Sequence, residues 1–197
     1  MPAKKESAPE VIVSSTGAWR AWLEVNHKTA RSVWLVIYKK ESATPSVRYP
    51  DAVDEALCFG WIDSTANKRD AESFKVRFTK RNPKSRWSKV NKEKVERLLK
   101  EKRMTPAGLA MIELAKKSGT WTALDAIENM EVPEDLKKEL KKQKGAAAYF
   151  DAFPRSVKKG ILEWIISAKK PETRARRVAE TAALAAKNVR ANQWPKR

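Results

Sequence analysis

The spacing of hydrophobic positions predicts strands in the first part of the chain. Residues 32–39 (SVWLVIYK) are apolar on both parities, which predicts a strand covered on both faces. Residues 74–81 alternate instead, which predicts a half-buried strand with a basic outer face. Its inward positions are Phe74, Val76 and Phe78, and its outward positions are Lys75, Arg77, Thr79 and Arg81.

Helical spacing separates these strands. Thr16 is an N-cap candidate for a helix that carries apolar residues on one face. Pro50 is favourable as a first helical residue, so we expect a helix over 51–59 that ends at Gly60. Residues 61–65 predict another strand, and residues 47–49 a short one.

From Pro83 onward the period is helical. Ser88 can cap a helix that runs to about Lys102, and Thr105-Pro106 opens the next one. Further amphipathic stretches cover residues 133–191.

These elements define an α+β fold class with a small, mostly antiparallel sheet and an all-helical C-terminal part. We expect a flexible arm over 1–14, which is polar and lacks a period. An α+β subdomain over 15–82 and a helical subdomain over 83–197 follow it, the latter with a basic C-terminal helix.

Charge concentrates in two segments of this layout. The 197 residues hold 42 Lys and Arg against 24 Asp and Glu, a net charge of +18. Residues 74–103 hold 13 basic and 3 acidic residues, and residues 155–197 hold 12 and 3. Because focused charge creates a local potential, both segments favour an anionic partner.

Composition excludes several classes. The single Cys and single His allow neither an intrachain disulfide nor a Cys/His zinc site, so we expect no metal and no cofactor. No stretch has the length of a signal-peptide apolar region or of a membrane span. The expected location is the cytoplasm, and the oligomeric state stays open.

The first basic segment is a candidate site for nucleic acid or another polyanion. A basic strand face leads into a basic turn and then into a helix N-terminus, where backbone N–H groups and cations bind phosphate. The phosphate-contacting candidates are Lys75, Arg77, Arg81, Lys84, Arg86 and Lys89, with Trp87 positioned to stack on a base. The alternative is a solvated basic face with Trp87 in the core.

The second basic segment is a candidate for the same role. Arg174 and Arg177 fall on the polar side of the last helix, which could lie along a duplex backbone or an anionic membrane surface. Its apolar stripe is mostly Ala and Val, too weak for firm membrane insertion, so packing against a neighbouring helix explains the stripe better.

No motif predicts catalysis. The P-loop, the dinucleotide fingerprint and the nucleophile elbow are all missing, and we assign no catalytic residue. His27 and Cys58 could pair as base and nucleophile, but a helix-end His and a buried Cys explain them better. Cys58, Trp61 and Asp63 could line a small-ligand pocket, unless Asp63 forms a structural ion pair.

Four segments together resemble the YdeI/OmpD-associated family, also called bacteriocin-protection. They are YPDAVDEALCFGWIDS (49–64), RFTKRNPKSRWSKVN (77–91), MTPAGL (104–109) and a stretch that starts FDAFPR (150–182). The likeness covers nearly all of 15–192 and departs at Lys80, where Pro is the commoner residue. It implies a bacterial or archaeal protein, a role in resistance to bacteriocins or cationic peptides, association with an outer-membrane porin, and no catalytic activity that can be transferred.

Three hypotheses follow. The leading one is a non-catalytic cytoplasmic protein that binds nucleic acid or another polyanion through the basic strand-turn-helix surface. The second is a stress or envelope-protection protein that acts through a protein partner. The third is an enzyme or small-ligand module with a pocket near Cys58, Trp61 and Asp63.

Overall fold

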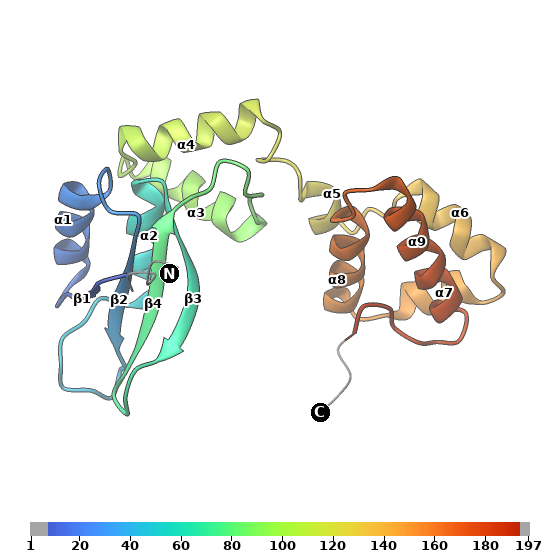
Figure 1. The fold of residues 1–197 in the computed structure, drawn as a ribbon, viewed down its shortest axis with the longest axis horizontal. Coiled ribbons are helices and arrows are strands. Elements are labelled where there is room, and N and C mark those ends of the chain that lie inside the picture. The colour runs from blue at the N-terminus through green and yellow to red at the C-terminus, as the bar shows by residue number, and fades with distance from the viewer. Residues whose placement is uncertain (1–7, 194–197) are drawn as a thin grey trace, which may run out of the picture. The chain divides into compact units, whose positions relative to one another are not determined.

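The computed structural model describes residues 8–193, and Figure 1 traces the fold. The chain divides into two compact units, Met1–Ala123 and Leu124–Arg197. We call the first the sheet unit and the second the helical unit. Strands lie in the N-terminal unit and helices alone in the described part of the C-terminal one, so the expected α+β class is confirmed.

A four-stranded sheet forms the centre of the sheet unit. Its strands are β1 (Glu10–Ile12), β2 (Ser32–Tyr38), β3 (Trp61–Lys68) and β4 (Ser73–Lys80), in the order β1-β2-β4-β3. The β1–β2 pair is parallel, whereas β4 runs antiparallel to both β2 and β3. The sheet is therefore mostly antiparallel, as expected from the order of elements in the sequence.

One face of this sheet packs against helices. They are α1 (Thr16–Asn26), α2 (Tyr49–Cys58), α3 (Lys89–Lys100) and α4 (Pro106–Lys117), and α2 runs behind the strands in Figure 1. Leu35 of β2 and Phe78 of β4 are fully buried in a core that also holds Trp19 of α1. The other face is less covered, and Arg77 is exposed there.

The boundary between units differs from the expected one after residue 82. Helices α3 and α4 contribute Val95, Leu98, Ile112 and Ala115 to the core under the sheet. A helical period identifies a helix but not the unit on which its apolar face packs. The sheet unit therefore extends to Ala123.

Three local predictions were wrong. Residues 10–12 of the expected arm form β1 on the edge of the sheet, while residues 1–7 lie outside the described part. Val47 is buried outside any strand and Tyr49 is the first residue of α2, so no strand forms over 47–49. The N-cap of α1 is Ser15, whose hydroxyl accepts from the Ala18 amide at 3.1 Å.

The helical unit buries a core of its own. Its helices are α5 (Asp125–Glu128), α6 (Glu134–Lys142), α7 (Ala146–Ala152), α8 (Arg155–Ile166) and α9 (Pro171–Ala185). The core joins Leu136 of α6, Phe150 of α7, Ile161 of α8 and Ala182 of α9, all fully buried. The small side chains of α9 therefore serve helix packing.

Candidate functional site

The structure separates the candidate cations of the first basic segment into three groups, of which the first lies on the open face of the sheet. Lys75 Nζ is 2.6 Å from Glu10 Oε1 and 5.2 Å from the centre of the Trp34 ring. Hydrogen bonds from Lys75 and Arg69 lower the pKa of Glu10, so this carboxylate stays ionised and offsets Lys75. Arg77 is exposed and donates to Ser32 Oγ at 3.3 Å.

The second group, Arg81 and Trp87, is buried and forms part of the fold. The Arg81 guanidinium lies 3.7 Å from the centre of the Trp87 ring, and Nη2 donates to the Arg86 carbonyl at 2.8 Å. Burial lowers the pKa of Arg81 to about 10. Because β4 ends at Lys80, the outward alternation does not extend to Arg81. The predictions that Arg81 contacts phosphate and that Trp87 stacks on a base are therefore wrong.

The third group is exposed on residues 82–89, which we call the basic loop. Lys84, Arg86 and Lys89 are all exposed. Lys89 lies 3.9 Å from Glu93, and within residues 8–193 neither Lys84 nor Arg86 forms an ion pair. The positive charge of these three exposed side chains is therefore largely not offset by neighbouring carboxylates.

Contacts at several points hold the basic loop in one conformation. The Asn82 side-chain oxygen accepts from the Lys84 amide at 2.9 Å, and the Asn82 carbonyl accepts from the Ser85 hydroxyl at 2.7 Å. The Trp87 amide donates to the Thr120 carbonyl at 3.3 Å. The Ser88 hydroxyl caps α3, as the sequence predicted, by accepting from the Asn91 amide.

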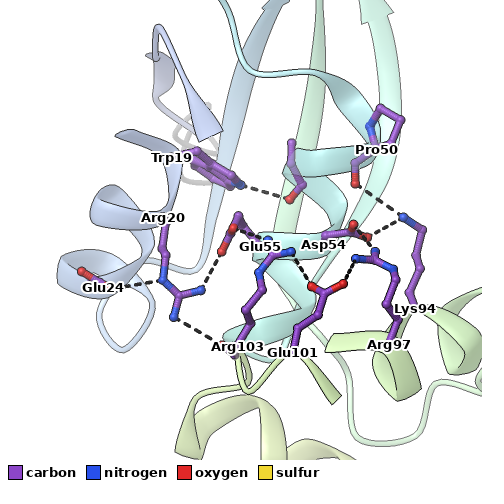
Figure 2. Close-up of polar contacts among 11 residues, drawn as sticks. Trp19, Arg20, Glu24, Pro50, Asp54, Glu55, Lys94, Arg97, Glu101 and Arg103 are labelled. Atoms are coloured by element: carbon purple, nitrogen blue, oxygen red, sulfur yellow. Dashed lines mark hydrogen bonds and ion pairs between the residues drawn. The ribbon is translucent and has the colours of Figure 1, made fainter. Parts of the chain in front are cut away.

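Two buried carboxylates on α2 form ion pairs with four basic side chains of the sheet unit (Figure 2). Glu55, only 3% exposed, accepts from Arg20 at 2.7 Å and from Arg103 at 2.5 Å. Asp54, 6% exposed, accepts from Lys94 at 2.5 Å and also pairs with Arg97. These ion pairs connect α2 to α1, to α3 and to the segment before α4.

Sequence reasoning missed this cluster. The partners of Asp54 lie 40 and 43 residues away in the chain, too far for residue spacing to reveal them. The acidic pair Asp54-Glu55 within the otherwise apolar stretch 52–59 is the signal that could have indicated buried ion pairs. Cations of the basic segment over 74–103 thus neutralise acids that precede this segment in the chain.

The pocket expected near Cys58, Trp61 and Asp63 does not gather these three residues. Cys58 is fully buried, and burial raises the pKa of its thiol to about 11. Trp61 lines a shallow hollow of about 320 Å³ beside His27. Asp63 instead accepts from the Tyr49 hydroxyl at 2.6 Å.

His27 and Cys58 are each hydrogen-bonded to other residues rather than to each other. The His27 Nδ1 lies 2.9 Å from the Leu23 carbonyl, so it carries the proton and donates. The Cys58 carbonyl accepts from both the amide and the hydroxyl of Thr105, at 3.1 and 2.7 Å. A nucleophile–base pair has no support in this geometry.

Two glycines in the segments that resemble the YdeI/OmpD-associated family allow close packing in the sheet unit. A Cβ on Gly108 would lie 2.3 Å from the Cys58 carbonyl oxygen, so only glycine permits this approach of α4 to α2. Gly60 has φ +72°, and a Cβ there would lie 3.1 Å from the Ala107 carbonyl oxygen. The segments 49–64 and 104–109 therefore join along a tight helix contact.

The candidate cations of the C-terminal helix are engaged within the helical unit. Arg174 forms a two-point ion pair with Asp135, at 2.6 and 3.0 Å, which lowers the pKa of that carboxyl. Arg177 lies 4.9 Å from the centre of the Trp164 ring and donates to Ser167 Oγ at 2.9 Å. Neither side chain extends freely toward a ligand.

The described residues offer no metal centre or membrane helix. Within residues 8–193 no three His, Cys, Asp or Glu side chains are grouped as metal ligands. No helix in the same range has the length and apolar character of a membrane span.

Fold and surface thus define a two-unit α+β protein with a basic loop on its sheet unit. The chain belongs to the family described as domain of unknown function DUF8412, whose model matches residues 11–111. Residues 129–188 match the model described as bacteriocin-protection, YdeI or OmpD-associated. The expected YdeI/OmpD-associated family is thus supported by a match within the helical unit alone. The motifs over 49–109 lie within the DUF8412 match instead. No curated protein and no solved structure matches the chain.

Proposed function

We propose that this chain is a non-catalytic cytoplasmic protein that binds nucleic acid or another polyanion through the basic loop of its sheet unit. The observation that carries the proposal is the position of Lys84, Arg86 and Lys89, three exposed cations on a loop whose conformation is held by internal hydrogen bonds. A held loop loses little conformational entropy when its cations contact phosphates. The net charge of +18 adds long-range attraction for any polyanion.

The proposal is narrower than a basic strand-turn-helix surface. Lys75 is offset by Glu10, and Arg81 and Trp87 are buried, so they do not contribute. Arg77 remains exposed on the open face of the sheet and stays a candidate contact. Because the remaining cations recognise phosphate rather than base edges, binding is expected to show little sequence preference.

The test is a gel shift of the full chain with a short DNA duplex, its single strand and an RNA of the same sequence. We expect binding at about 50 mM salt, where phosphate contacts are strong. The triple substitution K84A/R86A/K89A should weaken it at least tenfold, by about 1.4 kcal/mol or more. A matched control removes three exposed lysines of the helical unit, K138A/K141A/K144A, and should change affinity less.

Two results would contradict the proposal. One is no binding to any of the three nucleic acids at about 50 mM salt. The other is an equal loss of affinity in the two triple variants, which would mean that net charge acts without a defined site.

A second candidate function rests on the match of residues 129–188 to the bacteriocin-protection model. A chain of net charge +18 repels cationic peptides, so protection would act through a protein partner rather than by sequestering the peptide. A deletion strain should then become more sensitive to bacteriocins and polymyxin-type peptides. Unchanged sensitivity would remove this candidate.

A further inference from the structure

A cavity of about 600 Å³ lies in the sheet unit, apart from the basic loop. Its wall consists of the end of β2, the connection over residues 39–48, the first residue of α2 and Phe74 of β4. This volume falls in the range of pockets that hold small organic ligands. Neither the proposed polyanion site nor the pocket expected around Cys58 includes any of its lining residues.

The lining of this cavity is positively charged. It contains Lys39, Lys40 and Arg48 and no carboxylate. Lys39 donates to the Ala71 carbonyl at 2.6 Å, whereas within residues 8–193 Lys40 forms no ion pair. The closest acid to Arg48 is Asp51 at 3.8 Å, and Arg48 is 79% exposed, so this contact is weak. Lys40 and Arg48 are therefore the cations available to an anionic ligand.

The nearby polar groups are already arranged. Ser46 Oγ accepts from the Tyr38 amide at 3.1 Å and donates to the Val47 carbonyl at 3.3 Å. Ser42 Oγ accepts from the Thr44 amide at 3.2 Å and donates to Glu72, a carboxylate outside the lining, at 3.1 Å. These bonds give the connection a defined shape.

The cavity also has an apolar part. Ile37 and Phe74 are direct cross-strand partners, and both line it. Val47, which is 1% exposed, lies between the hydroxyl-bearing Ser46 and Arg48 in the same lining. A ligand that fits must therefore combine an anionic end with an apolar or aromatic body.

We propose that this cavity binds a small organic phosphate, with Lys40 and Arg48 at the phosphate and Phe74 against the organic part. Two cations without a lining carboxylate favour a dianionic group such as phosphate. The Tyr49 hydroxyl is already committed to Asp63, and burial raises its pKa to about 12, so it stays a neutral group at the cavity wall. This site is independent of the proposed polyanion binding.

The test is isothermal titration calorimetry of the full chain with adenosine 5′-monophosphate as the probe, with inorganic phosphate and adenosine as separate arms. We expect saturable binding of the nucleotide, weaker binding of phosphate and weakest binding of adenosine. Arg48→Ala and Lys40→Ala should each weaken nucleotide binding about tenfold, as expected for the loss of one charge-assisted hydrogen bond. Lys117→Ala, which removes an exposed cation elsewhere in the sheet unit, is the matched control and should leave affinity unchanged.

The same titration distinguishes the two proposals. The K84A/R86A/K89A variant should bind the nucleotide as the wild type does, even if it no longer binds nucleic acid. No saturable heat with the nucleotide at millimolar concentration would overturn the cavity proposal. An equal loss in Lys117→Ala and Arg48→Ala would overturn it too, because binding would then follow net charge alone.

Discussion

Replacing Glu55 with glutamine tests whether the buried ion pairs of α2 hold the sheet unit together. The Glu55 side chain is 4% exposed and accepts one hydrogen bond from Arg20 and one from Arg103. Glutamine keeps the size and one acceptor oxygen but removes the charge. The variant therefore isolates the electrostatic contribution without creating a cavity.

The expected magnitude follows from these two bonds. Arg20 and Arg103 bond different oxygens of Glu55, so glutamine with its one acceptor oxygen loses one of the two bonds. A hydrogen bond to a charged group contributes about 1.5–3 kcal/mol, which is the expected size of this loss. Arg20 and Arg103 are 30% and 33% exposed, so water partly solvates them when the charge is lost. We therefore expect the free energy of unfolding to fall by about 2 kcal/mol.

Urea unfolding followed by tryptophan fluorescence measures this change, because six of the eight tryptophans belong to the sheet unit. Glu101→Gln is the matched control, since Glu101 also pairs with Arg103 but is 38% exposed, and it should cost less than about 1 kcal/mol. Equal effects of the two substitutions would refute the argument that burial gives the Glu55 ion pairs their importance.

Two more predictions concern the contact between α2 and α4. Gly108→Ala should destabilise the sheet unit by about 1–3 kcal/mol, because its Cβ would lie 2.3 Å from the Cys58 carbonyl oxygen. Gly160→Ala in α8, where an added Cβ has nothing within 4 Å, should instead stabilise the protein by about 0.5–1 kcal/mol. Chemical denaturation measures both changes in the free energy of unfolding. The same sign for the two substitutions would contradict the packing argument. Burial raises the pKa of the Cys58 thiol from 9.0 to about 11, so the folded state holds the thiol proton more tightly than the unfolded state does. The free energy of unfolding should therefore fall as pH rises from 9.0 to about 11. Cys58→Ala should show a smaller decline over that range, and rapid reaction of native Cys58 with a thiol reagent at about pH 8 would contradict its burial.

Sequence pattern predicted elements more reliably than the surfaces on which they pack. Alternation placed Phe74, Val76 and Phe78 on the inner face of β4 correctly, because side chains of a regular strand alternate. The same rule misplaced Arg81, because β4 ends one residue earlier. The unit boundary was misplaced because periodicity does not show that α3 and α4 pack under the sheet.

Charge counted along the chain was a poor guide to charge at the surface. Residues 1–70 are almost neutral by themselves, yet Glu10, Asp54 and Glu55 from this segment neutralise cations of the basic segment that follows. Such pairings depend on tertiary contacts that residue spacing does not encode. What remains is a smaller group of exposed cations, Lys84, Arg86 and Lys89 on the basic loop and Arg77 on the open face of the sheet.

The salt dependence of nucleic-acid affinity tests the central claim most directly. Each phosphate contact on duplex DNA contributes about 0.9 to the slope of log affinity against log salt, so three contacts contribute about 2.7. The account predicts that K84A/R86A/K89A reduces the slope of the full chain by about 2 to 3, while K138A/K141A/K144A changes it by less than about 1. Equal slopes for the wild type and the K84A/R86A/K89A variant would contradict it, since the basic loop would then make no phosphate contact.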